Sequence, residues 1–210
     1  MSRRSKAGVI TLLLAAMTAL AMAPLLMPDS YSVVRHSVSE SAAQGVDGAW
    51  LARLGFLLFG FAALFLAVGH GSRWDGMGRL AHAGFGVSII AAAAFSHGPW
   101  DGSAFDEFED LLHFTASFGV GLFFTVGLVL VAVRRTHPPG WLRVVDGVAL
   151  VAALVIPLVM ANVSASGLVQ RVMFIVVFLW YGLETMRARG DDVGGGATLS
   201  TDAAQVNRNN

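Results

Sequence analysis

The sequence contains no cysteine and few charged residues. The absence of cysteine excludes disulfides, thiolate metal sites and cysteine nucleophiles. Charged residues make up 13% of the 210-residue chain, about half the share of a typical soluble domain. The formal net charge is zero, so no global field attracts a polyanion such as a nucleic acid. These shortages argue against a soluble enzyme, a disordered chain and a nucleic-acid-binding protein.

The chain is instead rich in apolar residues, which make up 55% of the sequence and give a mean hydropathy of +0.65. A bilayer core about 30 Å thick is crossed by a helix of about 20 apolar residues. The apolar runs are continuous rather than alternating, and backbone groups in lipid must be hydrogen-bonded within their own segment, so helices are expected rather than strands. The predicted spans are residues 7–27, 50–68, 80–96, 111–133, 144–161 and 168–186.

The connections between these spans are short, which predicts neighbouring antiparallel helices. The expected fold is therefore all-α, a six-transmembrane-helix up-down bundle over residues 1–189. Small residues inside the spans let helix backbones approach closely. They include Gly55, Gly60, Gly84, Gly86, Gly119, Gly121 and Gly127.

Both ends of the chain have features of their own. Residues 190–210 are rich in Gly, Asp and Asn without an apolar period, and we expect a disordered cytoplasmic tail. The first span ends in Ala21-Met22-Ala23, which is similar to a signal-peptide cleavage site. Pro24 directly after this site disfavours cleavage, so a retained first helix is the favoured interpretation.

The distribution of Lys and Arg over the short loops predicts the orientation. Ten basic residues lie before the first span, between spans two and three, between spans four and five, and after span six. The opposite side has Arg35, Arg53 and Arg171 and most of the acidic residues. Both termini are therefore expected to be cytoplasmic.

The segments predicted to lie outside collect polar side chains of several kinds. The first contains His36, Ser39 and Glu40, the second contains His97 and five acidic residues and leads into His113, and the third ends at Arg171. In a six-helix bundle these segments lie over one end and converge there. On a helix, Asp106, Asp110, His113 and Ser117 share one face.

A carboxylate above a histidine at the mouth of a span orients the imidazole or shares a metal with it. The alternative is a solvated acidic loop with an interfacial histidine. Arg171 lies three residues inside the sixth span, where an ionisable side chain normally has a partner. Asp110 and Glu40 are candidate counter-charges for Arg171, and such a pair is either functional or a structural pin between two helix ends.

On the predicted inner side, acidic residues lie close to arginines in the sequence. Glu184 is expected to pair with Arg187 or Arg189, and Asp146 with Arg143. No acidic residue lies at the midplane of a span, which argues against an ion-coupled pump with a central carboxylate.

The pattern resembles the domain of unknown function 998 family of bacterial and archaeal membrane proteins, from about residue 12 to residue 189. The residues that support the likeness are Tyr31, His36-Ser37-Val38-Ser39-Glu40, Trp50, Gly55-Phe56-Leu57-Leu58-Phe59-Gly60, Leu112-His113, Gly167-Leu168-Val169-Gln170-Arg171 and Trp180. The resemblance implies a six-helix, multi-pass protein of the prokaryotic plasma membrane. It implies no established activity.

Three functional hypotheses follow. The first is an integral membrane protein of unknown biochemical activity whose outer His/Asp/Glu/Arg cluster is structural or binds a small ligand. The alternative is a metal-dependent hydrolase of membrane lipid at the outer leaflet, with a residue inventory similar to that of seven-helix zinc hydrolases of lipid amides. A transporter ranks last, because midplane polar residues and broken paired helices are lacking.

The hydrolase hypothesis assigns a role to each polar residue. His36, Asp110 and His113 would be the ligands of a zinc ion, the expected cofactor. Glu40 would be the base, with Ser39 as the second catalytic candidate, and Arg171 would bind an anionic head group. Membrane lipid is the expected partner in this interpretation, and nucleic acid is not.

Overall fold

The computed structural model describes residues 1–69 and 74–188. The predicted disordered tail, residues 190–210, lies outside the described residues. Within the described ranges the chain contains helices and no strands. Six of the helices are long and apolar enough to cross a membrane, which confirms the predicted all-α fold.

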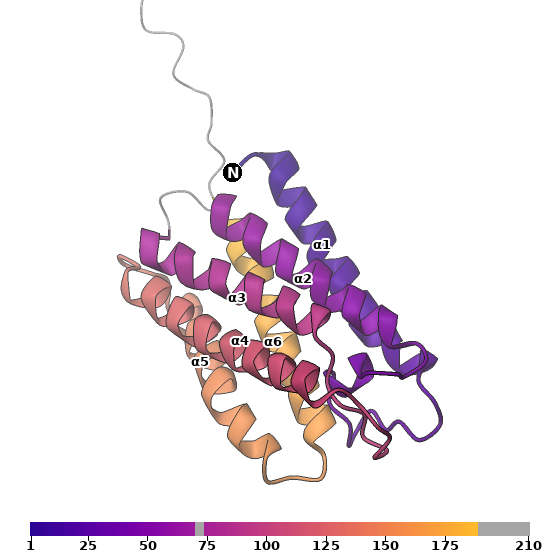
Figure 1. The fold of residues 1–210 in the computed structure, drawn as a ribbon. Helices are drawn as coiled ribbons and strands as arrows, with labels where there is room; N and C mark the ends of the chain where they lie inside the picture. Colours follow the sequence, from indigo (N-terminus) through magenta and orange to yellow (C-terminus); the bar gives the residue numbers. More distant parts are fainter. Residues whose placement is uncertain (70–73, 189–210) are drawn as a thin grey trace, which may run out of the picture.

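Each long helix overlaps one of the predicted apolar spans, and the order of the six helices is seen in Figure 1. Two short 3-10 turns, η1 (Ala23–Leu26) and η2 (Glu40–Ala42), lie between the first two long helices. The long helices are α1 (Arg3–Met22), α2 (Ala49–Gly69), α3 (Gly76–Ala94), α4 (Glu107–Val133), α5 (Gly140–Met160) and α6 (Ser166–Arg187).

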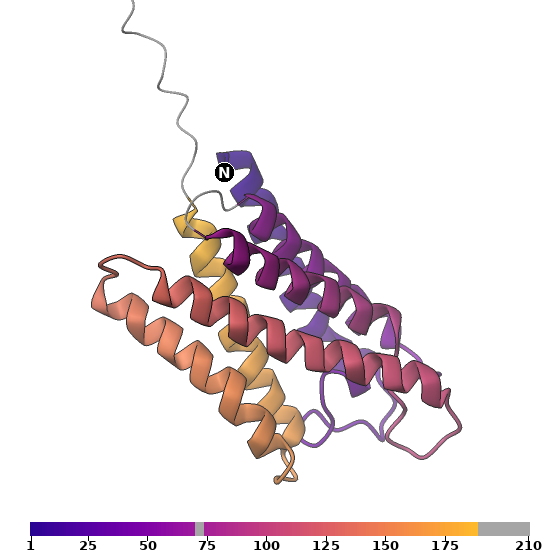
Figure 2. The same cartoon turned by 60° about the vertical axis from the view of Figure 1, so that its left-hand side comes forward.

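The helices follow one another around the bundle, and α6 returns to pack on α1 (Figures 1 and 2). The N-terminus and the end of α6 lie at the same end of the bundle, which we call the terminal end. Residues 27–48, 95–106 and 161–165 form the opposite end, which we call the loop end. The positive-inside rule predicts that the terminal end is cytoplasmic.

Polar caps explain why several helices begin before their apolar spans. The Asp75 carboxylate accepts the N–H of Gly78 at 2.7 Å, and α3 begins at Gly76. The Asp106 carboxylate accepts the N–H groups of Phe108 and Glu109 at 2.8 and 3.1 Å at the start of α4. Such caps satisfy backbone donors that have no partner within the helix.

The core of the bundle is aromatic. Phe59 of α2 stacks on Phe178 of α6 with ring centroids 4.1 Å apart. Phe85 of α3 stacks on Tyr181 of α6 at 5.1 Å, and Phe124 of α4 meets the edge of the Trp180 ring at 5.6 Å. These contacts join α2, α3 and α4 to α6 and fix the positions of the helix ends that carry the polar clusters.

Glycines permit the closest helix contacts. A Cβ atom at Gly60 would lie 2.8 Å from the carbonyl oxygen of Gly86, and one at Gly86 would lie 2.9 Å from that of Gly60. A Cβ at Gly127 would meet the His82 ring at 2.8 Å. The predicted packing role is confirmed at these positions. It is wrong for Gly121, because no heavy atom of another element lies within 4 Å of a Cβ built there.

Candidate functional site

The acidic residues at the start of α4 fasten the second loop of the loop end. Glu109 accepts the backbone N–H of Ser96 at 2.6 Å, and Asp110 accepts that of Gly98 at 2.7 Å. Gln44 joins this loop to the first one, because its side chain donates to the carbonyl oxygens of Ser96 and Asp106 at 3.0 Å. Glu109 and Asp110 therefore accept hydrogen bonds from main-chain N–H groups and hold the second loop against α4.

Arg171 holds the first loop against α6. Its Nη1 donates to the carbonyl oxygens of Val33, His36 and Gly167 at 2.8, 3.0 and 2.9 Å. Its Nη2 donates to the Tyr31 hydroxyl at 2.6 Å. The expected counter-charges, Asp110 and Glu40, make no ion pair with it, and main-chain oxygens take their place.

Glu40 and Ser39 lie in the first loop, where Glu40 takes part in a reciprocal cap. Its carboxylate accepts the N–H of Ser37 at 2.5 Å, and the Ser37 hydroxyl accepts the N–H of Glu40 at 3.1 Å. Ser39 precedes η2 and makes no capping hydrogen bond with its side chain. A role of Glu40 as a base would require the carboxylate to leave this cap.

His36 belongs to an aromatic group. Its ring stacks on Trp100 at 5.1 Å, and Tyr31 lies 5.4 Å from His36 and 5.2 Å from Trp100. The Ser32 N–H donates to His36 Nδ1 at 2.9 Å. A neutral imidazole in this arrangement carries its proton on Nε2, so neither ring nitrogen offers a free lone pair to a metal.

His113 and Asp110 lie near His97 instead. His113 Nδ1 lies 2.8 Å from the Phe95 carbonyl oxygen, which makes Nδ1 the donor and leaves a lone pair on Nε2. This Nε2 is buried and has no hydrogen-bond partner among the described residues. The His97 ring lies 5.4 Å from His113, and its Nδ1 lies 3.6 Å from Asp110 Oδ1.

The structure thus brings two of the three predicted zinc ligands, His113 and Asp110, close to His97, which was not predicted as a ligand. Within residues 1–69 and 74–188, no group of three or more His, Asp and Glu side chains is placed to hold a metal ion. His97 lies in the irregular segment that follows α3, and the hydrogen bond from the Gly98 N–H to Asp110 holds this segment against the start of α4. No helical spacing in the sequence indicates this contact.

Asp101 is an exposed carboxylate at the tip of the second loop. Ser103 donates to it from its hydroxyl at 2.6 Å and from its backbone N–H at 3.0 Å. These hydrogen bonds stabilise the charged form and lower the pKa of Asp101 below its ordinary value. The tip therefore keeps its negative charge to lower pH than a free aspartate does.

An apolar groove begins beside Arg171. A cavity of about 160 Å³ between α1 and α6 is lined by Arg171 together with Met17, Ala21, Val38 and other apolar residues. A second cavity of about 190 Å³ between the same helices shares Met17 and Phe178 with the first and reaches Met186 near the terminal end. We call these two cavities together the α1–α6 groove.

The terminal end holds a second polar cluster, in which two carboxylates are heavily bonded. Glu184 Oε1 accepts from Arg135 at 2.9 Å and from Arg187 at 2.7 Å, and Glu184 Oε2 accepts the indole N–H of Trp74 at 3.0 Å. The predicted pair of Glu184 and Arg187 is confirmed.

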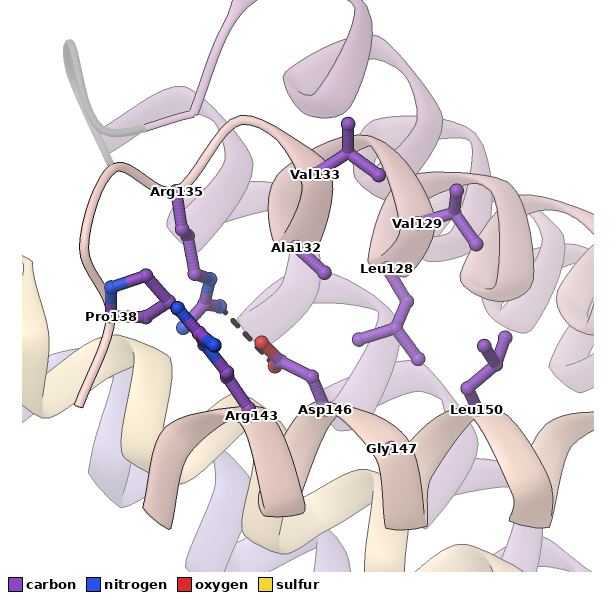
Figure 3. A pocket seen from close by; sticks show the side chains of 10 residues that line it. All are labelled: Leu128, Val129, Ala132, Val133, Arg135, Pro138, Arg143, Asp146, Gly147 and Leu150. Atoms are coloured by element: carbon purple, nitrogen blue, oxygen red, sulfur yellow. Dashed lines mark ion pairs between the residues drawn. The ribbon is translucent and has the colours of Figure 1, made fainter. Parts of the chain in front are cut away.

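Asp146 does not pair as expected. Its Oδ1 accepts the indole N–H of Trp180 at 3.0 Å and lies 3.5 Å from Nη2 of Arg135. The expected pair with Arg143 was wrong, because the connection after α4 places Arg135 against α5 (Figure 3). The sequence pattern around Arg135 indicates only the topology of the connection after α4, and the pairing with Asp146 has no signal in it.

A cavity of about 440 Å³ lies between α4 and α5 beside this cluster. Arg135, Arg143 and Asp146 line it, together with apolar residues of both helices (Figure 3). A neighbouring cavity of about 500 Å³ shares Arg135 and Pro138 with it. We call these two cavities together the arginine pocket.

Comparisons with known proteins give a family but no activity. A family model described as a protein of unknown function, DUF998, matches residues 7–186. No curated protein and no solved structure is significantly similar to the chain.

Proposed function

This chain belongs to the DUF998 family of proteins of unknown function, and we propose that it binds an anionic membrane lipid at its loop end. The lipid phosphate would contact Arg171, and an acyl chain would occupy the α1–α6 groove. The single observation that carries this proposal is that Arg171, at the rim of an apolar groove between two helices able to cross a membrane, has no carboxylate partner among the described residues.

The charge of Arg171 supports an anionic ligand. All its hydrogen-bond acceptors among the described residues are uncharged oxygens. The bonds to carbonyl groups and to Tyr31 engage both hydrogens of Nη1 and one of Nη2, so the second Nη2 hydrogen and the Nε hydrogen remain available. A phosphate oxygen is a strong acceptor for such groups.

The position of the groove supports a lipid rather than a soluble anion. Its walls between α1 and α6 are apolar apart from Arg171. Both helices are long and apolar enough to cross the bilayer, so acyl chains are the molecules that surround the groove. The predicted orientation places Arg171 at the outer leaflet.

The loop-end contacts give the polar cluster a structural part in this function. Arg171, Gln170 and Arg53 each bond to main-chain groups of the first loop, Gln170 through the N–H of Val38 at 2.5 Å and Arg53 through the carbonyl of Ala43 at 2.8 Å. The first loop is thereby held beside the groove, and Val38 contributes to its wall. These polar residues therefore hold the first loop in place, and one of them, Arg171, also lines the proposed lipid site.

The test compares two arginines that bond to the same loop. The purified protein in micelles is titrated with phosphatidylglycerol, and bound lipid is counted by native mass spectrometry. Arg171→Gln should weaken binding about tenfold, because one charge-assisted hydrogen bond contributes about 1.5 kcal/mol or more. Arg53→Gln is the matched control, since Arg53 also bonds to loop carbonyls but does not line the groove.

A second variant keeps the proposal testable if Arg171→Gln disturbs the fold. Ala21→Phe fills the groove and leaves Arg171 in place. It should also reduce phosphatidylglycerol binding. Binding that is equal in the unchanged protein, Arg171→Gln and Ala21→Phe would refute the proposal.

The zinc hydrolase alternative has one supporting observation: the buried Nε2 of His113 has no hydrogen-bond partner in the part of the chain that the structure describes. For His36, Asp110 and His113 to act together, His36 would have to leave its contacts with Ser32 and Trp100. The alternative stays a prediction, and metal analysis tests it as described in the Discussion.

A further inference from the structure

The arginine pocket at the terminal end contains buried donors that the protein itself does not satisfy. The Arg135 side chain is 9% exposed. Its Nε and Nη1 atoms are buried and have no hydrogen-bond partner among the described residues. A guanidinium is always charged and offers five N–H groups, and Arg135 lines both cavities of the pocket.

The carboxylates beside Arg135 do not use these donors. Glu184 contacts Nη2 of Arg135, and so does Asp146. The two acids also accept hydrogen bonds from Arg187, Trp74 and Trp180. Nε and Nη1 are thus left for a ligand.

The charge of the pocket favours an anion. Arg135, Arg143 and Arg187 line it against the two carboxylates of Asp146 and Glu184. Arg134 also lines the pocket, but it lies 3.5 Å from Asp75. Arg143 forms no ion pair among the described residues, and Figure 3 shows it reaching from α5 into the cavity that Arg135 enters from the other side.

The remaining walls indicate which anion fits. The apolar part of the wall between α4 and α5 includes Leu128, Val129, Val133 and Leu150. Val129 and Val133 also have 40% and 77% of their surfaces exposed, as expected of residues that face lipid. An amphiphile with a phosphate at the arginines and a chain along this wall matches both parts of the pocket.

We propose that the arginine pocket binds the phosphate group of a lipid, with Arg135 and Arg143 as the phosphate ligands and the α4–α5 wall as the seat of its acyl chain. Phosphate accepts several hydrogen bonds at once and suits paired guanidinium groups. The site is separate from the α1–α6 groove and shares no residue with it. Arg171, the phosphate contact of the first site, lies at the loop end, and the arginines of this pocket lie at the terminal end, so variants at one site test it independently of the other.

The experiment titrates the full-length protein in micelles with phosphatidic acid. Diacylglycerol with the same chains serves as the ligand without phosphate, and inorganic phosphate serves as the ligand without chains. We expect phosphatidic acid to bind at least about tenfold more tightly than either one, since each lacks half of the recognition. Inorganic phosphate that binds as tightly as phosphatidic acid would overturn the assignment to a lipid.

Variants locate the binding in the pocket without removing Arg135 from its buried ion pairs. Arg143→Gln should weaken phosphatidic acid binding about tenfold. Arg79→Gln, an exposed arginine of the same end outside the pocket, is its control. Gly147→Phe should fill the cavity, because a Cβ at Gly147 meets no heavy atom of another element within 4 Å.

Gly121→Phe is the control for added bulk, because Gly121 has equally open surroundings and does not line the pocket. The proposal predicts weaker binding in Arg143→Gln and Gly147→Phe and unchanged binding in Arg79→Gln, Gly121→Phe and Arg171→Gln. Equal affinity across all five variants would overturn it. Loss in Arg171→Gln alone would support the α1–α6 groove and overturn the arginine pocket.

Discussion

The contact between Gly60 and Gly86 gives a sharp test of how α2 and α3 are held together. A Cβ at Gly60 would lie 2.8 Å from the backbone oxygen of Gly86 and 2.5 Å from Cγ1 of Ile90. The side chain of Ile90 can change its rotamer, but the Gly86 oxygen belongs to a helix and cannot move alone. Gly60→Ala must therefore push α2 and α3 apart.

The expected cost follows from two opposing effects. Overpacking a tight interior costs about 1–3 kcal/mol, and alanine in place of glycine returns up to about 1 kcal/mol in a helix. The backbone atom in the way places Gly60→Ala toward the upper end of the first range. We expect a net loss of about 2 kcal/mol in the free energy of unfolding.

Gly121→Ala is the matched control. A Cβ at Gly121 meets no heavy atom of another element within 4 Å, so only the gain in helix propensity of up to about 1 kcal/mol applies. Reversible unfolding of the purified variants in mixed micelles measures both values. Equal stability of Gly60→Ala and Gly121→Ala would refute the inferred backbone contact.

Two further predictions concern the loop end and the orientation. If zinc is bound through His113, metal analysis should find it in the unchanged protein and not in His113→Ala, whereas equal and negligible zinc in both leaves the hydrolase alternative without support. Because the chain lacks cysteine, single cysteines report topology directly. An impermeant maleimide should label Ser103→Cys in intact cells and His137→Cys only after lysis, and the reverse pattern would invert the predicted orientation.

The helical bundle could be predicted because lipid leaves the backbone few choices. A segment in hydrocarbon must satisfy its own N–H and C=O groups, so a long apolar run already specifies a helix. The residues at which the helices begin were harder to predict. Asp75 and Asp106 each cap a helix that begins four residues before its predicted span, because capping depends on side-chain oxygens rather than on hydropathy.

The partners of Arg171 could not be predicted from residue types. The sequence indicates that an arginine inside a span needs acceptors, and the acidic residues of the outer loops are the obvious candidates. The acceptors found are three main-chain carbonyl groups and Tyr31. Every residue has a carbonyl group, so such a partner leaves no pattern in the sequence.

The burial of Arg135 could not be predicted for a related reason. It stands next to Arg134 after the fourth span, where two arginines read as one topological signal. The structure separates them, since the side chain of Arg134 is 64% exposed and that of Arg135 is 9% exposed. Only the tertiary arrangement of α5 and α6 supplies the two carboxylates that permit this burial.

The two ends of the bundle use their charges in different ways, and both leave arginine N–H groups available. At the loop end, carboxylates such as Glu109 bind backbone donors, so Arg171 is left with neutral acceptors. At the terminal end, Glu184 and Asp146 bind arginines and indoles together, and Nε and Nη1 of Arg135 have no acceptor within residues 1–69 and 74–188. An arginine with unused donors favours an anion, and each of these arginines lies beside an apolar wall. Both proposed sites therefore use arginines as their ligand contacts, whereas Glu109, Asp146 and Glu184 hold the backbone or an arginine in place.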